Sequence, residues 1–171
     1  MPDALPPLVL VLGGARSGKS RQAEALVTSL PAPWIYIATA EAHDAEMAER
    51  IAAHRATRAP GWRTVEAPLD LAAALAEAGA RPVLVDCLTL WLTNLLLAGH
   101  DIAAAQDDLL AALARREAPT VLVSNEVGLG IVPDNALARR FRDAAGRLNQ
   151  RVAAIAYHAL FIAAGLPIRL K

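Results

Sequence analysis

The chain has 171 residues, which is the size of one domain. Hydrophobic residues make up 55% of the chain and charged residues 20%, which indicates a globular protein with a buried core and excludes a disordered chain. Lysine plus arginine and aspartate plus glutamate each total 17, so the formal net charge is zero and no overall basic field attracts nucleic acid or anionic lipid. Cys87 is the only cysteine, which excludes an intrachain disulfide and a multi-cysteine zinc site.

Short aliphatic runs alternate with helical patterns through the first half of the chain. Continuous apolar runs are typical of strands that are covered on both faces, as in parallel sheets. After a proline-containing lead-in, the predicted strands cover residues 8–12, 34–39, 62–66 and 82–87. The predicted helices cover residues 19–29, 43–57 and 70–79. Pro60 and Gly61 end the second of these helices.

The same alternation continues through the second half. It predicts helices over residues 88–98, 101–116 and 135–157, and a strand over residues 120–124. The tail ALFIAAGLPIRLK predicts two short strands around a turn at Gly165-Leu166-Pro167. No internal repeat or long linker divides the chain. We therefore expect one α/β domain over residues 1–171, with a mostly parallel sheet, helices on both faces and a C-terminal β-hairpin.

A phosphate-binding loop is the strongest local motif. Residues 13–20 read GGARSGKS, which matches G-x-x-x-x-G-K-[ST] in full, and a predicted strand leads in while a predicted helix leads out. Glycines let backbone N–H groups surround phosphate oxygens, Lys19 suits the β- and γ-phosphates, and the Ser20 hydroxyl suits Mg²⁺. A glycine turn that fits the pattern by chance is the alternative. The motif and its context together predict a P-loop domain that binds a nucleoside triphosphate.

Two strand ends supply further candidates. Asp86 ends the run VLVD, where P-loop proteins place a carboxylate that serves as the second magnesium anchor after the loop hydroxyl. The alternative is an aspartate that caps the following helix, and one residue can do both. Thr39 ends the run WIYIAT and so also lies at the carboxyl edge of the predicted sheet, where ligands of open α/β sheets bind. These positions predict a metal site for Mg²⁺ at Ser20 and Asp86.

The phosphate loop by itself does not identify the substrate, because ATPases, GTPases and small-molecule kinases share it. The short chain is typical of a small-molecule kinase. The sequence has no N-K-x-D motif for reading guanine, which disfavours a Ras-like GTPase.

Longer segments resemble one enzyme family. The run GGARSGKSRQAEAL is similar to the opening of the bifunctional adenosylcobinamide kinase / adenosylcobinamide-phosphate guanylyltransferase family of cobalamin biosynthesis. Three further segments agree in the same order: YIATAEAHDAEMAERIAAHR, VDCLTLWLTNLL and SNEVGLGIVPDNALARRFRDAAGRLNQRVA. Together they cover most of residues 11–156, and ordinary kinases do not carry NEVGLGIVP followed by RRFRDAAGRLNQ.

This resemblance implies two reactions at one nucleotide site. A nucleoside triphosphate, ATP or GTP, phosphorylates the aminopropanol hydroxyl of adenosylcobinamide. GTP then transfers GMP to that phosphate through a covalent guanylyl-histidine, which gives adenosylcobinamide-GDP and pyrophosphate. The family histidine maps to His54 in ERIAAHR, and Ala53 stands where some relatives carry a second histidine. Lys19 and His54 are the expected catalytic residues, and the family also implies a homotrimer.

By the same matching, the resemblance implies nucleotide contacts in several segments. The expected contacts are Gly13, Gly14, Ala15, Arg16, Ser17, Gly18, Lys19, Ser20, Thr39, Ala40, Glu41, Arg55, Ala56, Thr57, Arg58, Glu66 and Asp86.

Residue chemistry leaves alternatives open at five of the singled-out positions. His54 shares a helical face with apolar residues, which is also typical of a core histidine. Arg55 and Arg58 suit a solvated helix face as well as a phosphate. Glu66 is consistent with an acceptor for the two adjacent N–H donors of guanine, and equally with an exposed acid at the end of a strand. Glu126 suits either a general base or an acid that fixes its loop.

Two rival functions follow from these alternatives. A plain small-molecule P-loop kinase has no need of His54. A non-enzymatic GTP-binding switch holds GTP without transferring a group.

Other classes of protein are disfavoured by composition. Aromatic residues total only 4%, too few for stacking nucleic-acid bases. Polar residues interrupt the longest apolar runs, so we expect no membrane span. The N-terminus lacks the basic region of a secretory signal, so a cytoplasmic location is the expectation.

Overall fold

The computed structural model describes residues 5–42, 45, 49, 51–52, 56 and 58–171. Its strands are β1 (Leu8–Gly13), β2 (Trp34–Ala38), β3 (Trp62–Glu66), β4 (Val83–Asp86), β5 (Thr120–Asn125), β6 (His158–Ala163) and β7 (Leu166–Arg169). Its helices are α1 (Lys19–Thr28), α3 (Leu71–Glu77), α4 (Leu88–Leu97), α5 (Ile102–Ala114) and α6 (Ala136–Ile155). The predicted helix at 43–57 lies largely outside the described residues; those described within it are helical.

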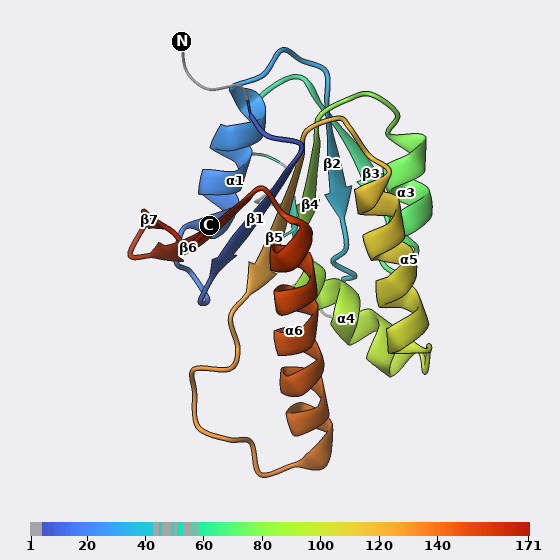
Figure 1. Ribbon diagram of the computed structural model, residues 1–171, viewed down its shortest axis with the longest axis vertical. Coiled ribbons are helices and arrows are strands. Elements are labelled where there is room, and N and C mark those ends of the chain that lie inside the picture. The colour runs from blue at the N-terminus through green and yellow to red at the C-terminus, as the bar shows by residue number, and fades with distance from the viewer. Residues whose placement is uncertain (1–4, 43–44, 46–48, 50, 53–55, 57) are drawn as a thin grey trace.

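One sheet of seven strands organises the described part of the chain, in the order β3-β2-β4-β5-β1-β6-β7 (Figure 1). All neighbouring pairs are parallel except β6 and β7, which are antiparallel. This confirms the predicted α/β fold with a mostly parallel sheet and a C-terminal hairpin. The carboxyl ends of β1 to β6 therefore meet at one edge of the sheet, and β5 separates the strand of the phosphate loop, β1, from the strand of Asp86, β4.

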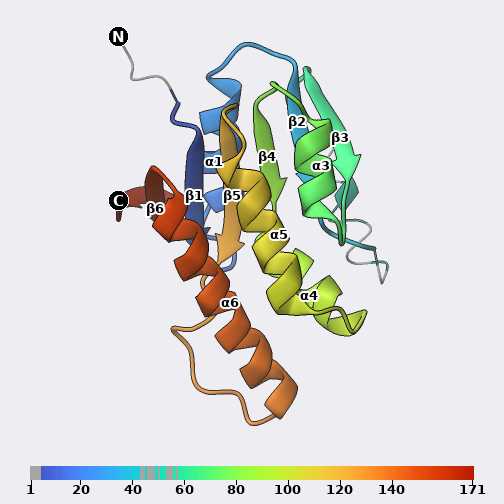
Figure 2. The same ribbon diagram turned by 45° about the vertical axis from the view of Figure 1, so that its right-hand side comes forward.

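Helices cover both faces of the sheet, as predicted (Figures 1 and 2). On one face, α1 packs through Ala23 and Val27 against a cluster that includes Val9 and Val11 of β1. On the other face, α3, α4, α5 and α6 pack against a larger cluster that includes Leu10 of β1. Alternate residues of each central strand thus enter different cores, and this explains why the strands are continuously aliphatic.

The position of the hairpin turn differs from the prediction. Ala164 and Gly165 form the turn, with φ values of 50° and 80°, while Leu166 and Pro167 already belong to β7. A two-residue hairpin turn needs left-handed backbone at its central residues because that twist matches the twist of the strands. Pro167 fits within β7 because an edge strand tolerates a missing N–H.

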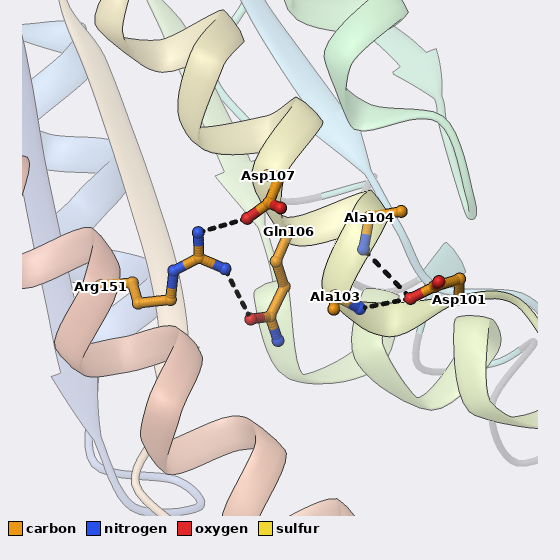
Figure 3. Close-up of polar contacts among 6 residues, drawn as sticks. All are labelled: Asp101, Ala103, Ala104, Gln106, Asp107 and Arg151. Atoms are coloured by element: carbon orange, nitrogen blue, oxygen red, sulfur yellow. Dashed lines mark hydrogen bonds and ion pairs between the residues drawn. The ribbon is translucent and has the colours of Figure 1, made fainter.

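Arg151 links the long helix α6 to α5. Arg151 donates hydrogen bonds to Asp107 Oδ1 at 2.5 Å and to Gln106 Oε1 at 3.3 Å (Figure 3). Asp101 caps the start of α5 by accepting from the N–H groups of Ala103 and Ala104. The contacts of Arg151 thus link two helices that cover the same face of the sheet. No helix in the described part of the chain has both the length and the apolar character that crossing a membrane requires.

Candidate functional site

The phosphate loop closes tightly between β1 and α1. Gly18, the residue before α1, has φ 93°, and Arg16 has φ 56°, so the loop turns through left-handed backbone at two positions. Ser17 N–H donates to Gly14 O at 3.3 Å, and Lys19 Nζ donates to the same oxygen at 3.1 Å. No side chain caps α1 and no acidic residue lies in its first turn. The positive end of the helix dipole and the Lys19 ammonium therefore meet at this loop, as an anion site requires.

Gly13 is required by close packing under the loop. A Cβ at Gly13 would lie 2.5 Å from Ser17 Oγ and 2.8 Å from Ile162 O, closer than real Cβ atoms approach other heavy atoms. Ser17 Oγ is buried there with no hydrogen-bond partner in the described structure. The loop thus rests directly on β1 and β6, and only glycine leaves room for this arrangement.

Asp86 stands at the end of β4 on the face that α1 covers. Its Oδ2 accepts a hydrogen bond of 2.8 Å from the hydroxyl of Tyr36 in β2. Burial, and then the negative charge of Asp86, raise the pKa of Tyr36 far above its ordinary value, so the phenol remains a proton donor. Asp86 does not cap α4, whose N-cap residue is Cys87 and which has no side-chain cap. The carboxylate is therefore held by Tyr36 and not by the following helix.

Ser20 and Asp86 suit Mg²⁺ rather than a metal held by protein alone. The described residues contain no group of three or more His, Cys, Asp or Glu side chains that could hold a metal ion. Mg²⁺ commonly binds through one or two protein oxygens together with substrate phosphates and water. Among the described residues, the carboxylate of Asp86 makes its hydrogen bond through Oδ2, and Oδ1 makes none. A hydroxyl at the start of α1 and a carboxylate oxygen at the same sheet edge fit that mode of binding.

Thr39 fastens the ends of two strands. Its side chain is fully buried; Oγ1 donates to Cys87 O and accepts from Cys87 N–H, both at 2.8 Å. Thr39 N–H donates to Asp86 O at 3.2 Å, and Thr39 O accepts from Asn94 Nδ2 at 2.8 Å. Thr39 therefore positions the end of β4 next to Asp86, and its expected contact with nucleotide stays a prediction. Burial, followed by the charge of Asp86, raises the pKa of the Cys87 thiol to about 11, which agrees with a core cysteine.

Arg58 lies against Tyr36 rather than on a solvated helix face. Its guanidinium carbon is 3.3 Å from the centroid of the Tyr36 ring, and Nη1 donates to Thr64 Oγ1 at 3.1 Å. Its Nε is buried and has no hydrogen-bond partner in the described structure. Trp62 meets the same tyrosine edge-on, with ring centroids 5.7 Å apart. Arg58, Tyr36 and Asp86 therefore form one connected line of contacts.

The end of β5 is held by a buried polar network. Asn125 N–H donates to Thr89 Oγ1 at 2.7 Å, Ser124 Oγ donates to Asn149 Oδ1 at 2.7 Å, and Asn149 Nδ2 donates to Asn125 O at 3.3 Å. The network joins α4, β5 and α6. Glu126 follows it: its N–H donates to Gly13 O at 3.1 Å and its Oε1 accepts from Gly128 N–H at 2.6 Å. The observed contact of the Glu126 carboxylate is thus the loop-fixing one.

The structure brings part of the predicted site together. The phosphate loop, Thr39 and Asp86 lie at the carboxyl edge, with Ala40 half-buried and Glu41 exposed just after β2. Glu66 ends β3 and is exposed, in register with Ala38. Ala56 is helical and exposed. The expected residues His54, Arg55 and Thr57 lie outside the described residues.

Sequence reasoning missed several residues that shape this edge. Tyr36, Thr89, Asn94 and Asn149 all hold functional segments through side-chain hydrogen bonds. For Tyr36, Thr89 and Asn94 the available signal was a polar side chain within an apolar run, as in WIYIAT and LTLWLTNLL; Asn149 lies among polar residues in GRLNQRV and carried no such signal. Buried polar groups of this kind are normally hydrogen-bonded, but the sequence does not say to what.

A shallow hollow lies at the opposite edge of the sheet, where strands begin. Its volume is about 460 Å³, and alanines of α3 and α5 line much of it, including Ala72, Ala76 and Ala112. Arg116 closes it by donating hydrogen bonds to the carbonyl oxygens of Leu75, Gly79 and Arg81. None of the predicted site residues lines this hollow, so we place the functional site at the carboxyl edge.

Sequence comparisons find similarity to one family of bifunctional enzymes. Residues 9–170 match the family described as cobinamide kinase / cobinamide phosphate guanyltransferase. The chain is 53% identical to the bifunctional adenosylcobalamin biosynthesis protein CobP of Pseudomonas aeruginosa, over 95% of this chain and 96% of that protein. It is 45% identical to the bifunctional adenosylcobalamin biosynthesis protein CobU of Salmonella typhimurium, over 96% of this chain and 99% of that protein.

Solved structures with low sequence identity share the fold. A protein from Pyrococcus horikoshii matches with a TM-score of 0.55 at 13% identity, over 96% of this chain and 85% of that one. An ATPase from a bacterial type III secretion system matches with a TM-score of 0.55 at 14% identity, over 98% of this chain and 59% of that one. These similarities concern the arrangement of the sheet and its helices.

Proposed function

Because the chain belongs to the cobinamide kinase / cobinamide phosphate guanyltransferase family, we propose that its phosphate-loop site carries out both reactions of a bifunctional adenosylcobalamin biosynthesis enzyme. The observation that supports this best is the closed loop over residues 13–20 at the uncapped start of α1, on the same sheet edge as Asp86. That edge offers a phosphate cradle, a lysine ammonium and a positioned carboxylate.

In the kinase reaction, the hydroxyl oxygen of adenosylcobinamide attacks the γ-phosphorus of ATP or GTP. The bond from that phosphorus to the β–γ bridging oxygen breaks, the nucleoside diphosphate leaves with the electron pair, and the hydroxyl proton is released to water. Backbone N–H groups of the loop and the Lys19 ammonium stabilise charge on the phosphoryl oxygens. Ser20 and Asp86 would hold Mg²⁺, which supplies further charge neutralisation and orients the phosphates when bound.

In the guanylyltransferase reaction, an imidazole nitrogen of His54 attacks the α-phosphorus of GTP and pyrophosphate leaves. The phosphate oxygen of adenosylcobinamide phosphate then attacks the same phosphorus and releases the histidine. The assignment of His54 rests on the family resemblance. Arg58, four residues later in the sequence, stacks on Tyr36, whose hydroxyl donates to Asp86, so Arg58 supplies a cation beside the carboxylate's hydrogen-bond partner.

The remaining expected contacts belong to the same proposal. Ala40, Glu41 and Glu66 follow or end strands at this edge, so they lie on the side of the sheet where the nucleotide would bind. We also propose that the chain forms a homo-oligomer, a trimer by family resemblance. Exposed apolar side chains, among them Leu166 and Ile168 of β7, offer surface for such an assembly.

Incubation with adenosylcobinamide, GTP and Mg²⁺, followed by mass analysis of the corrinoids, tests the function. We expect adenosylcobinamide phosphate to appear first and adenosylcobinamide-GDP afterwards. Phosphate product without the GDP product would favour the plain kinase. An unchanged corrinoid would refute the enzyme assignment, and GTP binding without transfer would favour the switch module.

A further inference from the structure

The turn of the C-terminal hairpin touches the phosphate loop through backbone atoms. Gly165 N–H donates a hydrogen bond of 2.8 Å to Ser17 O. A Cβ built on Gly18 would lie 3.2 Å from Gly165 Cα, so the two glycines are in close contact. Figure 1 shows the hairpin at the edge of the sheet beside β1, the strand that leads into the loop. One side of the loop is therefore confined by β6 and by the turn that follows it.

Within a single chain, core packing does not account for β7. All four of its residues are exposed, including Leu166 at 69% and Ile168 at 52%, and the strand pairs with β6 alone. Strands are usually maintained by the apolar surface they bury. What β7 does in this fold is return the chain through the left-handed turn at Ala164 and Gly165, which directs the Gly165 N–H at the phosphate loop.

The geometry of a peptide unit connects this hydrogen bond to phosphate binding. In a trans peptide the carbonyl oxygen of one residue and the N–H of the next point in opposite directions. When Gly165 holds Ser17 O toward the hairpin, the N–H of Gly18 must point away from the hairpin. A flip of this peptide would replace a hydrogen-bond donor with a carbonyl oxygen, which repels phosphate.

We propose that Gly165 is a positioning residue that fixes the peptide between Ser17 and Gly18 in the orientation needed for phosphate binding. This inference rests on the proposed nucleotide-binding function. It assigns the C-terminal hairpin a role in both reactions, because both use the same phosphate loop.

The test compares proline substitutions at two glycines with similar backbone. Gly165→Pro removes the N–H and excludes the positive φ of 80°. Gly99→Pro is the matched control: Gly99 has φ 72°, its N–H donates to Leu96 O at 3.3 Å, and nothing lies within 4 Å of a Cβ built there. Gly99 follows the carboxyl end of α4, whereas the opposite end of that helix adjoins Asp86.

Binding of a fluorescent GTP analogue and melting temperature are measured for each variant. We expect both proline variants to lose thermal stability, but only Gly165→Pro to bind the analogue about tenfold more weakly. Gly165→Asn keeps the N–H and tolerates left-handed backbone, and its Cβ would meet only the end of the Arg21 side chain at 3.5 Å. Its affinity should therefore stay close to that of the unaltered chain.

Each outcome bears on one claim. If the unaltered chain does not bind the analogue, the proposed function fails. If the unaltered chain binds it and folded Gly165→Pro binds equally well, the positioning role of Gly165 is wrong. Should Gly165→Pro not fold, amide hydrogen exchange of the unaltered chain decides: GTP should slow exchange at Gly165 about tenfold and leave Gly99 unchanged. Equal exchange at Gly165 with and without GTP would overturn the proposal.

Discussion

Replacing Tyr36 by phenylalanine should weaken catalysis through Asp86 while leaving the aromatic packing in place. The substitution deletes the hydroxyl that donates a hydrogen bond of 2.8 Å to Asp86 Oδ2. The phenyl ring can still pack under the Arg58 guanidinium and against Trp62, and Tyr36 is only 3% exposed. Tyr36→Phe therefore removes one hydrogen bond without creating a large cavity.

The size of the effect follows from the acceptor and its exposure. Hydrogen bonds to charged groups contribute about 1.5–3 kcal/mol. Asp86 is half-buried, so water can partly replace the hydroxyl, and we take the lower end of that range. A loss of about 1.5 kcal/mol in transition-state stabilisation lowers kcat/KM by slightly more than tenfold. The free energy of unfolding should fall by a similar amount, about 1–2 kcal/mol.

Steady-state kinetics of adenosylcobinamide phosphorylation, measured over a series of Mg²⁺ concentrations, tests this prediction. We expect Tyr36→Phe to need more Mg²⁺ for half-maximal rate, because its carboxylate is less well oriented. Tyr157→Phe makes the same chemical change at an exposed residue and serves as the control. If Tyr36→Phe keeps kcat/KM within about twofold of the unaltered chain at every Mg²⁺ concentration, the argument that Tyr36 orients Asp86 is refuted.

Three further experiments test other parts of the structure. Lys19→Ala should fold normally and lose kinase turnover about a hundredfold or more, because its ammonium offsets charge on the transferred phosphoryl group; a normal rate would contradict the assigned phosphate loop. His54→Asn should no longer retain label from the α-phosphate of GTP, a label that acid removes and alkali spares, while phosphorylation of adenosylcobinamide largely persists; retained label would mean a different nucleophile. The thiol pKa of Cys87 is raised to about 11, so at pH 9 Cys87 carries less reactive thiolate than an ordinary cysteine. Iodoacetamide should therefore alkylate Cys87 slowly in the folded chain and quickly in urea. Equal alkylation rates in the two conditions would refute the burial argument.

The element pattern and the phosphate loop were predictable because both depend on neighbours in the chain. Aliphatic runs identify buried strands, as β1 and β5 illustrate, and GGARSGKS constrains its own backbone through glycine and helix initiation. The predicted position of the hairpin turn was one or two residues too late, because Gly165-Leu166-Pro167 also has the composition of a turn. The left-handed backbone at Ala164 and Gly165, which decides the register, is not visible in composition.

The sequence by itself thus determined the α/β class, the phosphate loop and the candidate carboxylate at Asp86. Only the tertiary structure decided what holds them. Thr39 bonds Cys87, and Tyr36 bonds Asp86, across separations of 48 and 50 positions, because β2 lies beside β4 in the sheet. Periodicity reports which residues are buried, but strand order is set by the packing of the whole chain. For the same reason the contact between Gly165 and the phosphate loop appears only once β6 has paired with β1.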